Sequence, residues 1–499
     1  MKKQKRYILS IDQGTSGTKA LLFDERGKFV QRHNEVHEQF YPNPGWVEHD
    51  ADEIFNQAVS AIDGVINSAG IHPSEVAAVA ITNQRETVVV WDRHTGVPIC
   101  NAIVWQCNRS AEICKTISEQ GYGDVIKKKT GLVLSPYYSA SKIKWILDNV
   151  DGARKKAENG DLIFGTIDSW LIFKLTGGKV HATDCSNASR TQLMNLYDLA
   201  WDEETMDIFT IPMSMAPKIC SSDHVFGKLE VSCLSSENVQ ITGVLGDSHA
   251  ALFGQNCFER GMAKVTYGTG SSIMMNIGDK PYDSKNGLVT SVGWNLSGDV
   301  VYVAEGNINC SAATIKWLVD DLELIPNSKI SEEIALSVDD NGGVYLVPAF
   351  VGLGSPYWDS DATALITGMT RGTKKSHVVR AALESIAYQV KDIIDIMTAE
   401  ADVTLKEIRV DGGASRNGFL MQFQADILNA NVVVNCLEEI CAIGAAYMAG
   451  LSAKIWSSPS ELESLRINDT FFKPLAETEE CRELYDGWKK AVARTLAKF

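Results

Sequence analysis

The sequence predicts an α/β protein built from two similar lobes around a central cleft. Two observations predict it. Amphipathic helices alternate with short, wholly apolar strands as far as about residue 200, and a strand–turn–strand unit near the start recurs half a chain later. A chain of 499 residues is also long enough to form two domains with separate cores.

The first lobe begins with two strands joined by a tight turn. Residues 7–12 (YILSID) and 18–24 (TKALLFD) are the strands, and the Gly- and Ser-containing residues between them form the turn. Residues 52–70 follow as a helix, because isoleucines and alanines recur on one face. The apolar run 76–82 (VAAVAIT) is then a buried strand.

The second lobe repeats this plan. Residues 262–279 (MAKVTYGTGSSIMMNIGD) again predict a strand, a Gly/Thr-rich turn and a strand. A helix, a strand ending in a Gly turn, and two further helices are expected at 377–397, 405–413, 417–430 and 484–499. The duplication alone divides the chain into lobes of residues 1–251 and 252–499, because no Pro/Gly/Ser-rich linker separates them.

Composition narrows the possible partners and location. The chain is 45% hydrophobic with a formal net charge of −16, which argues against nucleic acid as the main partner but allows a phosphorylated small ligand. The 11 scattered cysteines include no CxxC pair and predict reduced thiols in a cytoplasmic protein. The first apolar run stops at Asp12, too short for a signal peptide, and no run of about twenty apolar residues predicts a membrane span.

Two turns carry the signal for phosphate binding. They are DQGTSGT at 12–18 and TYGTGSS at 266–272. Such turns expose backbone N–H groups and hydroxyls that attract phosphate oxygens, and Asp12 at a strand end could anchor Mg²⁺. Either turn alone is better explained as a plain hairpin, whereas the matched pair favours phosphate. The motifs GxxxxGK[ST] and GxGxxG are absent, so the chain has no P-loop or Rossmann fingerprint.

A third Gly-containing element, DGGASRN at 411–417, lies between a predicted strand and a helix. Close approach of its backbone to an adenosine and an ordinary strand-to-helix turn explain it about equally well. In the first explanation Asn417 caps the helix or hydrogen-bonds the ligand.

Charged and aromatic residues in apolar surroundings indicate a second site. Asp247 is the sharpest candidate, because it follows an apolar strand, where ligands bind in open α/β sheets, and could accept a proton from an alcohol. Five other residues are weaker, since surface ion pairing or core packing explains each of them alone: Arg85, Glu86, Trp105, Tyr137 and Asp168.

The whole chain resembles the FGGY family of carbohydrate kinases. The resemblance rests on ordered segments that include SIDQGT, NPGWVEHD, ITNQRET, NAIVWQ, YGTG, GLGSPYWD and VDGGASRN. Both family signatures appear, as YYSASKIKWI at 137–146 and ALITGMTRGTKKSHVVRAALE at 364–384. It implies two actin-like (ribonuclease H-like) ATPase lobes around a central cleft, with ATP and Mg²⁺ as cofactors, a small-molecule polyol as partner, and a homo-oligomer.

The resemblance also implies roles for individual residues. Asp12 and Asp247 would hold Mg²⁺, and Asp247 would be the catalytic base. The nucleotide would contact Thr15, Ser16, Gly17, Lys19, Gly268, Thr269, Ala312, Lys316, Gly413 and Asn417. The polyol would contact Arg85, Glu86, Trp105, Tyr137, Asp247, Ser248 and Ser272.

Several of these positions depart from the family members that phosphorylate glycerol. Those have Gln where this chain has Ser248 and Phe where it has Ser272, so this pocket is roomier and more polar. Gly17 and Lys19 stand in place of Ser and Arg, which replaces a bidentate phosphate clamp by a point charge. Two further departures, Ala312 and Lys316 in place of Gly and Gln, adjoin the expected nucleotide.

The sequence therefore predicts an ATP-dependent polyol kinase working by in-line phosphoryl transfer, with glycerol as the leading substrate. A four- or five-carbon polyol or ketose, such as erythritol, threitol or xylulose, is the alternative, because it would fill the space beside Ser272. A non-kinase actin-like ATPase is a further alternative, and it would have no use for the residues of the polyol site.

Overall fold

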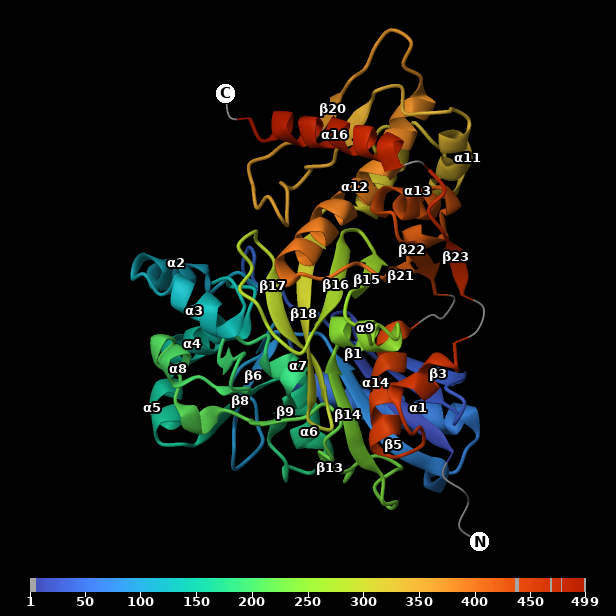
Figure 1. The fold of residues 1–499 in the computed structure, drawn as a ribbon. Coiled ribbons are helices and arrows are strands. Elements are labelled where there is room, and N and C mark those ends of the chain that lie inside the picture. Colours follow the sequence, from blue (N-terminus) through green and yellow to red (C-terminus); the bar gives the residue numbers. More distant parts are fainter. Residues whose placement is uncertain (1–5, 436–438, 467–468, 477, 498–499) are drawn as a thin grey trace.

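The computed structural model describes residues 6–435, 439–466, 469–476 and 478–497. Two large sheets dominate it (Figure 1). The six-stranded first sheet has the order β13 (Gly227–Lys228), β14 (Gln240–Gly246), β5 (Val76–Asn83), β1 (Tyr7–Gly14), β2 (Gly17–Phe23), β3 (Phe29–Val36). The seven-stranded second sheet has the order β17 (Val289–Leu296), β18 (Asp299–Ile308), β16 (Ser271–Gly278), β15 (Met262–Tyr267), β21 (Glu407–Gly412), β22 (Asn431–Val434), β23 (Thr470–Phe472).

Smaller sheets extend this framework. A four-stranded sheet has the order β4 (Glu48–His49), β7 (Ala102–Ile103), β6 (Val88–Asp92), β8 (Leu162–Thr166). Three two-stranded pairs are β9 (Ala182–Asp184) with β12 (Lys218–Cys220), β10 (Met194–Asn195) with β11 (Ala200–Trp201), and β19 (Tyr345–Val347) with β20 (Leu365–Thr367).

Helices cover the sheets and fill the space between them. In the first half they are α1 (Ala51–Ala69), α2 (Ala111–Glu119), α3 (Gly123–Thr130), α4 (Ser139–Asn149), α5 (Ala153–Glu158), α6 (Ile167–Leu175), α7 (Cys185–Ala188), α8 (Glu203–Ile208) and α9 (Asp247–Gly254). In the second half they are α10 (Ala312–Asp320), α11 (Ser331–Leu336), α12 (Lys375–Ala401), α13 (Gly418–Leu428), α14 (Ile440–Ser452), α15 (Pro459–Glu463) and α16 (Thr478–Thr495). None of the helices in the described ranges is long and apolar enough to cross a membrane.

The predicted elements are present, with shifted ends. The first turn is tighter than expected, because β1 runs to Gly14 and β2 begins at Gly17. Helix α1 begins after Asp50, whose side chain accepts hydrogen bonds from two backbone N–H groups of the first turn, and ends at Gly70 with φ of 64°. Helix α16 begins at Thr478, six residues before the predicted start. These differences are local and leave the α/β alternation intact.

Separate apolar cores hold the two sheets. Helices α1 and α6 pack on one face of the first sheet, and α9 and α14 pack on its other face. The second sheet packs against α12, which is in turn covered by α13 and α16 (Figure 1). Helix α14 thus comes from the second half of the chain but lies against the first sheet. The division of the chain at residues 251 and 252 stays a prediction.

The strand order places the candidate residues at the same sheet edges. Strands β1, β5 and β14 are parallel, and Asp12, Asn83 and Gly246 all lie at their carboxyl ends. In the second sheet β15 is parallel to β21, with Tyr267 opposite Gly412. Open α/β sheets bind ligands at the carboxyl ends of their parallel strands. In both sheets the candidate residues therefore lie where a ligand is expected.

Candidate active site

The first phosphate turn is the two-residue connection Thr15–Ser16 between β1 and β2. Asp12 lies opposite Lys19 in this hairpin, three residues before the turn. Burial raises the pKa of Asp12 to about 7, partly offset by the nearby Lys19 ammonium. Gly17 is required by the packing of the sheet, because a Cβ there would lie 2.3 Å from the carbonyl oxygen of Glu35 in β3.

Lys19 is engaged by a carboxylate from the far end of the chain. Its Nζ lies 2.6 Å from Glu439 Oε2, and Arg32 Nη1 lies 2.9 Å from the other oxygen of the same carboxylate. Glu439 stands immediately before α14 with φ of 63°. Lys19 is therefore near the first turn as predicted, but its charge is already shared with a protein carboxylate.

The second phosphate turn joins β15 to β16 and is tied to the start of α10. The carbonyl oxygen of Gly268 accepts a hydrogen bond from Ala312 N at 3.1 Å, and that of Thr269 accepts one from Ser311 N at 2.8 Å. Ala312 thus lies beside this turn, as expected of a nucleotide contact. The side chain of Lys316, one turn further along α10, is 79% exposed, and its Nζ lies 3.9 Å from Asp320 Oδ2.

The third element follows β21 at the neighbouring position in the second sheet. The closely packed glycine of this element is Gly412, whose φ is 91°. A Cβ added at Gly412 would lie 2.2 Å from the carbonyl oxygen of Tyr267. Gly413, which the sequence singled out, has open space around it. Asn417 caps α13, accepting a hydrogen bond from Leu420 N at 2.9 Å, and its Nδ2 donates to Ser331 Oγ.

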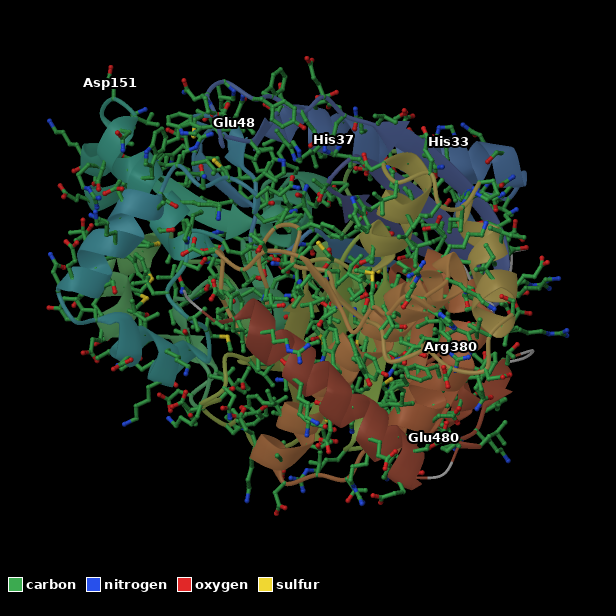
Figure 2. The ribbon with its side chains drawn as sticks, turned by 90° about the horizontal axis from the view of Figure 1, so that it is seen from above. His33, His37, Glu48, Asp151, Arg380 and Glu480 are labelled. Atoms are coloured by element: carbon green, nitrogen blue, oxygen red, sulfur yellow. The ribbon has the colours of Figure 1, made fainter. Side chains whose placement is uncertain are left out.

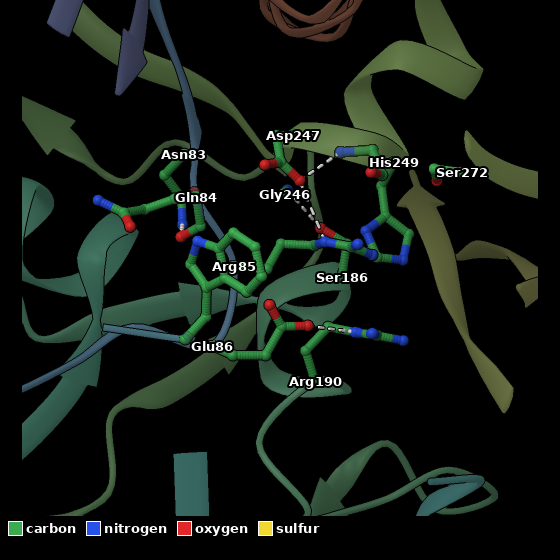
Figure 3. A network of polar contacts seen from close by, with 12 residues as sticks. Asn83, Gln84, Arg85, Glu86, Ser186, Arg190, Gly246, Asp247, His249 and Ser272 are labelled. Carbon is green, nitrogen blue, oxygen red and sulfur yellow. Dashed lines mark hydrogen bonds and ion pairs between the residues drawn. The ribbon is translucent and has the colours of Figure 1, made fainter. Parts of the chain in front are cut away.

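Asp247 is the first residue of α9 and directly follows β14. Its Oδ1 lies 3.1 Å from Arg85 Nε, and its side chain is 39% exposed. Figure 3 shows Arg85 beside Asp247. Arg85 itself is buried and donates through both Nη atoms to Glu305, at 3.1 and 2.9 Å. The Asp247 carboxylate thus lies at the carboxyl end of a strand, is accessible to a ligand, and is held on one side by the buried guanidinium of Arg85.

Glu86 is held in a conformation that few non-glycine residues adopt. Its φ is 63°, in the left-handed region. Arg190 Nε donates to its carboxylate at 2.7 Å, and Ser139 Oγ donates to its backbone carbonyl at 3.0 Å. Strain of this kind collects at functional sites, where the surrounding structure keeps a side chain aimed in one direction.

Two aromatic side chains lie beside the first turn. Trp105 donates through Nε1 to Thr15 Oγ1 at 3.0 Å, and its ring packs edge-on against Tyr137, with centroids 5.5 Å apart. The loop that carries Tyr137 is fixed by Lys142, whose buried Nζ donates to the carbonyl oxygens of Pro136, Tyr137 and Tyr138. Burial lowers the pKa of Lys142 to about 7.

The two serines that depart from the family pattern have different surroundings. Ser248 follows Asp247 at the start of α9, and its backbone N–H donates to the Asp247 carboxylate at 2.6 Å. Ser272 in β16 lies 3.2 Å from Nζ of Lys264, a buried lysine whose other partner is the Thr266 hydroxyl. Ser272 thus has a polar neighbour, in keeping with the more polar pocket that the sequence predicts.

Family models match most of the chain. The model of the FGGY family of carbohydrate kinases, N-terminal domain, matches residues 7–254, and that of the C-terminal domain matches residues 263–453. The chain belongs to the FGGY family of carbohydrate kinases. It is 50% identical to glycerol kinase 2 of Thermotoga maritima over 98% of this chain and 99% of that one, and 51% identical to glycerol kinase of Oceanobacillus iheyensis over 98% of each.

Solved structures confirm the actin-like two-lobe fold of this FGGY kinase. The crystal structure of Plasmodium falciparum glycerol kinase with ADP superposes with a TM-score of 0.95 at 39% identity, covering 99% of each chain. A xylulose kinase from Lactobacillus acidophilus shares the fold with a TM-score of 0.87 at 22% identity, covering 98% of each chain.

The donors present in this FGGY kinase fit magnesium. The described residues contain no group of three or more His, Cys, Asp or Glu side chains placed to hold a metal. Mg²⁺ in kinases is bound by one or two carboxylates, with waters and substrate phosphates completing its shell. Asp12 is a partly exposed carboxylate opposite Lys19. Desolvation raises its pKa to about 7, and a bound cation would stabilise its charged form.

The FGGY kinase also contains site residues that the sequence did not predict. Asp168, considered for the substrate side, is fully buried and accepts hydrogen bonds from Thr166 and Thr183. Glu305 and Arg190 are paired charged residues beside Arg85, and the only available signal for Glu305 was a carboxylate directly after the apolar run 300–304. Their pairing spans more than a hundred residues, which no local pattern reveals.

Proposed function

We propose that this protein is an ATP-dependent glycerol kinase, which converts ATP and glycerol to glycerol 3-phosphate and ADP. The observation that carries the proposal is the partly exposed Asp247 carboxylate, fixed 3.1 Å from Arg85 at the carboxyl end of β14. The proposal is supported by near-full-length relatives, 50% identical, that are named glycerol kinase.

The alcohol would bind among the side chains around Asp247. Arg85 and Glu86 supply fixed hydrogen-bonding groups, and Trp105 and Tyr137 supply the apolar face for the carbon chain. Ser248 and Ser272 would complete the pocket beside Asp247.

The nucleotide would bind between the two turns and the third Gly-containing element. Thr15, Ser16, Gly17 and Lys19 would meet its phosphates from the first sheet. From the second sheet, the proposed contacts are Gly268, Thr269, Ala312, Lys316, Gly413 and Asn417. The open space at Gly413 suits close approach of a nucleoside.

Asp12 and Asp247 would hold Mg²⁺, which when bound would neutralise phosphate charge. In the transfer itself, Asp247 accepts the proton of a terminal glycerol hydroxyl as that oxygen attacks the γ-phosphorus in line and the bond to ADP breaks. Arg85 keeps the Asp247 carboxylate oriented, and the N–H groups of the two turns stabilise the transferring oxygens. Closure around the alcohol keeps water from taking its place.

Steady-state kinetics on a panel of acceptors tests this proposal. We expect glycerol to have a higher kcat/KM than erythritol, threitol or xylulose. A preference for a longer polyol or ketose would support the alternative suggested by Ser272 and its contact with Lys264. ATP hydrolysis at a rate indifferent to every acceptor would instead indicate a non-kinase ATPase.

A cytoplasmic location, predicted from the cysteine pattern, and a homo-oligomeric state, implied by the family resemblance, stay predictions. Light scattering on the purified protein would measure the second.

A further inference from the structure

Two arginines and two glutamates form a buried chain behind Asp247. In order they are Glu86, Arg190, Glu305 and Arg85. Arg190 Nε lies 2.7 Å from Glu86, Arg190 Nη1 lies 2.8 Å from Glu305, and both Nη atoms of Arg85 bond to Glu305. None of the four side chains is more than 6% exposed. Figure 3 shows Arg85 and Arg190 beneath Asp247, and Glu86 beside them.

Glu305 and its two arginine partners belong to different halves of the chain. Glu305 lies in β18 of the second sheet, opposite Met274 of β16, whereas Arg85 and Arg190 belong to the first half of the chain. The same second sheet carries the turn Gly268–Gly270 at the end of β15. Glu305 therefore links the sheet with the second phosphate turn to the arginine that contacts Asp247.

The charges of the buried chain balance without Asp247. Two guanidinium groups face two carboxylates, so Arg85 is neutralised by Glu305 and does not depend on Asp247 for a counter-charge. The guanidinium is planar, so anchoring both Nη atoms on Glu305 also fixes the direction of its Nε toward Asp247.

We propose that Glu305 is a positioning residue for phosphoryl transfer, which acts through Arg85 on Asp247 and joins the two halves of the site. This inference rests on the proposed glycerol kinase activity. Loss of the Glu305 charge would leave two buried arginines with only Glu86 between them. Arg85 would then turn to Asp247 for its counter-charge and displace it, and the contact that joins the second sheet to the alcohol site would be lost.

The test compares Glu305→Gln and Glu305→Asp with wild type. Glu384→Gln is the matched control, because Glu384 is also buried and paired with an arginine, Arg380 Nε at 2.9 Å. Arg380 lies in α12, and Figure 2 shows it on the opposite side of the view from Glu48 of the first half. Each variant is assayed for kcat, for KM of ATP and of glycerol, and for the ratio of ADP to glycerol phosphate formed.

We expect Glu305→Gln to lower kcat with glycerol roughly tenfold to hundredfold, because misplacement of a reacting group is costly. KM for ATP should stay within about twofold, since Glu305 does not contact either turn, and ADP should exceed glycerol phosphate as water competes. Glu305→Asp, which restores the charge, should recover part of kcat and move the product ratio back toward one. Glu384→Gln should lower thermal stability but keep the product ratio at one.

Two results would overturn the inference. One is a Glu305→Gln enzyme with kcat and product ratio like wild type. The other is a loss shared by Glu305→Gln and Glu305→Asp alike, with the product ratio at one in both, which would mean a structural role only. Should Glu305→Gln fail to fold, Glu305→Asp decides alone: wild-type kcat and coupling contradict the proposal. Failure of wild type to phosphorylate glycerol would contradict the proposed function instead.

Discussion

Replacement of Asp247 by asparagine removes the proposed base with little other damage. The side chain is 39% exposed, and its partner Arg85 keeps two hydrogen bonds to Glu305 when the carboxylate is gone. A half-exposed ion pair contributes at most about 1 kcal/mol to stability, so the variant should fold. Asparagine has nearly the same shape but cannot accept the hydroxyl proton.

The expected loss of activity follows from this. General base catalysis contributes about 10²- to 10⁴-fold, so kcat for glycerol should fall by at least about 100-fold. This corresponds to an increase in the activation free energy of about 3 kcal/mol or more. Affinity for ADP without metal should change by less than about threefold, because the backbone of the two turns is untouched.

The assay measures glycerol-dependent ADP formation, with nucleotide affinity followed by calorimetry and folding by thermal unfolding. Asp395→Asn is a matched control, because Asp395 is 45% exposed and pairs with Lys391 at 3.0 Å on α12. It should keep wild-type activity. An Asp247→Asn enzyme that retained more than about a tenth of wild-type kcat would refute the assignment of Asp247 as base.

Three further predictions concern the pocket, the tyrosine loop and pH. Ser248→Gln combined with Ser272→Phe should raise kcat/KM for glycerol relative to erythritol roughly tenfold, because the added side chains fill the pocket; an unchanged ratio would show that these positions do not set substrate size. Lys142→Met should raise KM for glycerol and destabilise the fold by about 1–3 kcal/mol, because buried carbonyls that fix the Tyr137 loop lose their donor; an unaltered KM would contradict this role. Burial raises the pKa of Asp392 to about 6, so the native state holds this proton more tightly than the unfolded chain. Unfolding free energy should therefore fall by roughly 3 kcal/mol between about pH 4 and pH 7 relative to Asp392→Asn, as measured by urea titration at each pH; parallel curves would refute it.

The sequence predicted those parts of the fold that depend on local pattern. The paired strands on either side of Thr15 and Gly268, the long helix α12 and the strand before Gly412 all follow from apolar periodicity and turn residues. The same local reasoning placed Asp247 at the carboxyl end of a strand, where the structure has it.

Features that depend on distant parts of the chain could not be read in this way. Glu439 reaches Lys19 across more than four hundred residues, and Glu305 reaches Arg85 across more than two hundred. Gly17 is required by the close approach of the β3 backbone, and helix α14 packs against the first sheet. Each of these is a product of tertiary packing, which sets partners and close approaches that sequence spacing leaves open.

We predict that ATP at the two turns and an alcohol at Asp247 bind next to each other. The most direct measurement is a crystal structure with glycerol, magnesium and a non-hydrolysable ATP analogue. We predict a terminal glycerol hydroxyl within hydrogen-bonding distance of the Asp247 carboxylate, and the γ-phosphate between the turns at Thr15 and Gly268. Glycerol bound away from Asp247, or a triphosphate that leaves either turn uncontacted, would contradict the account.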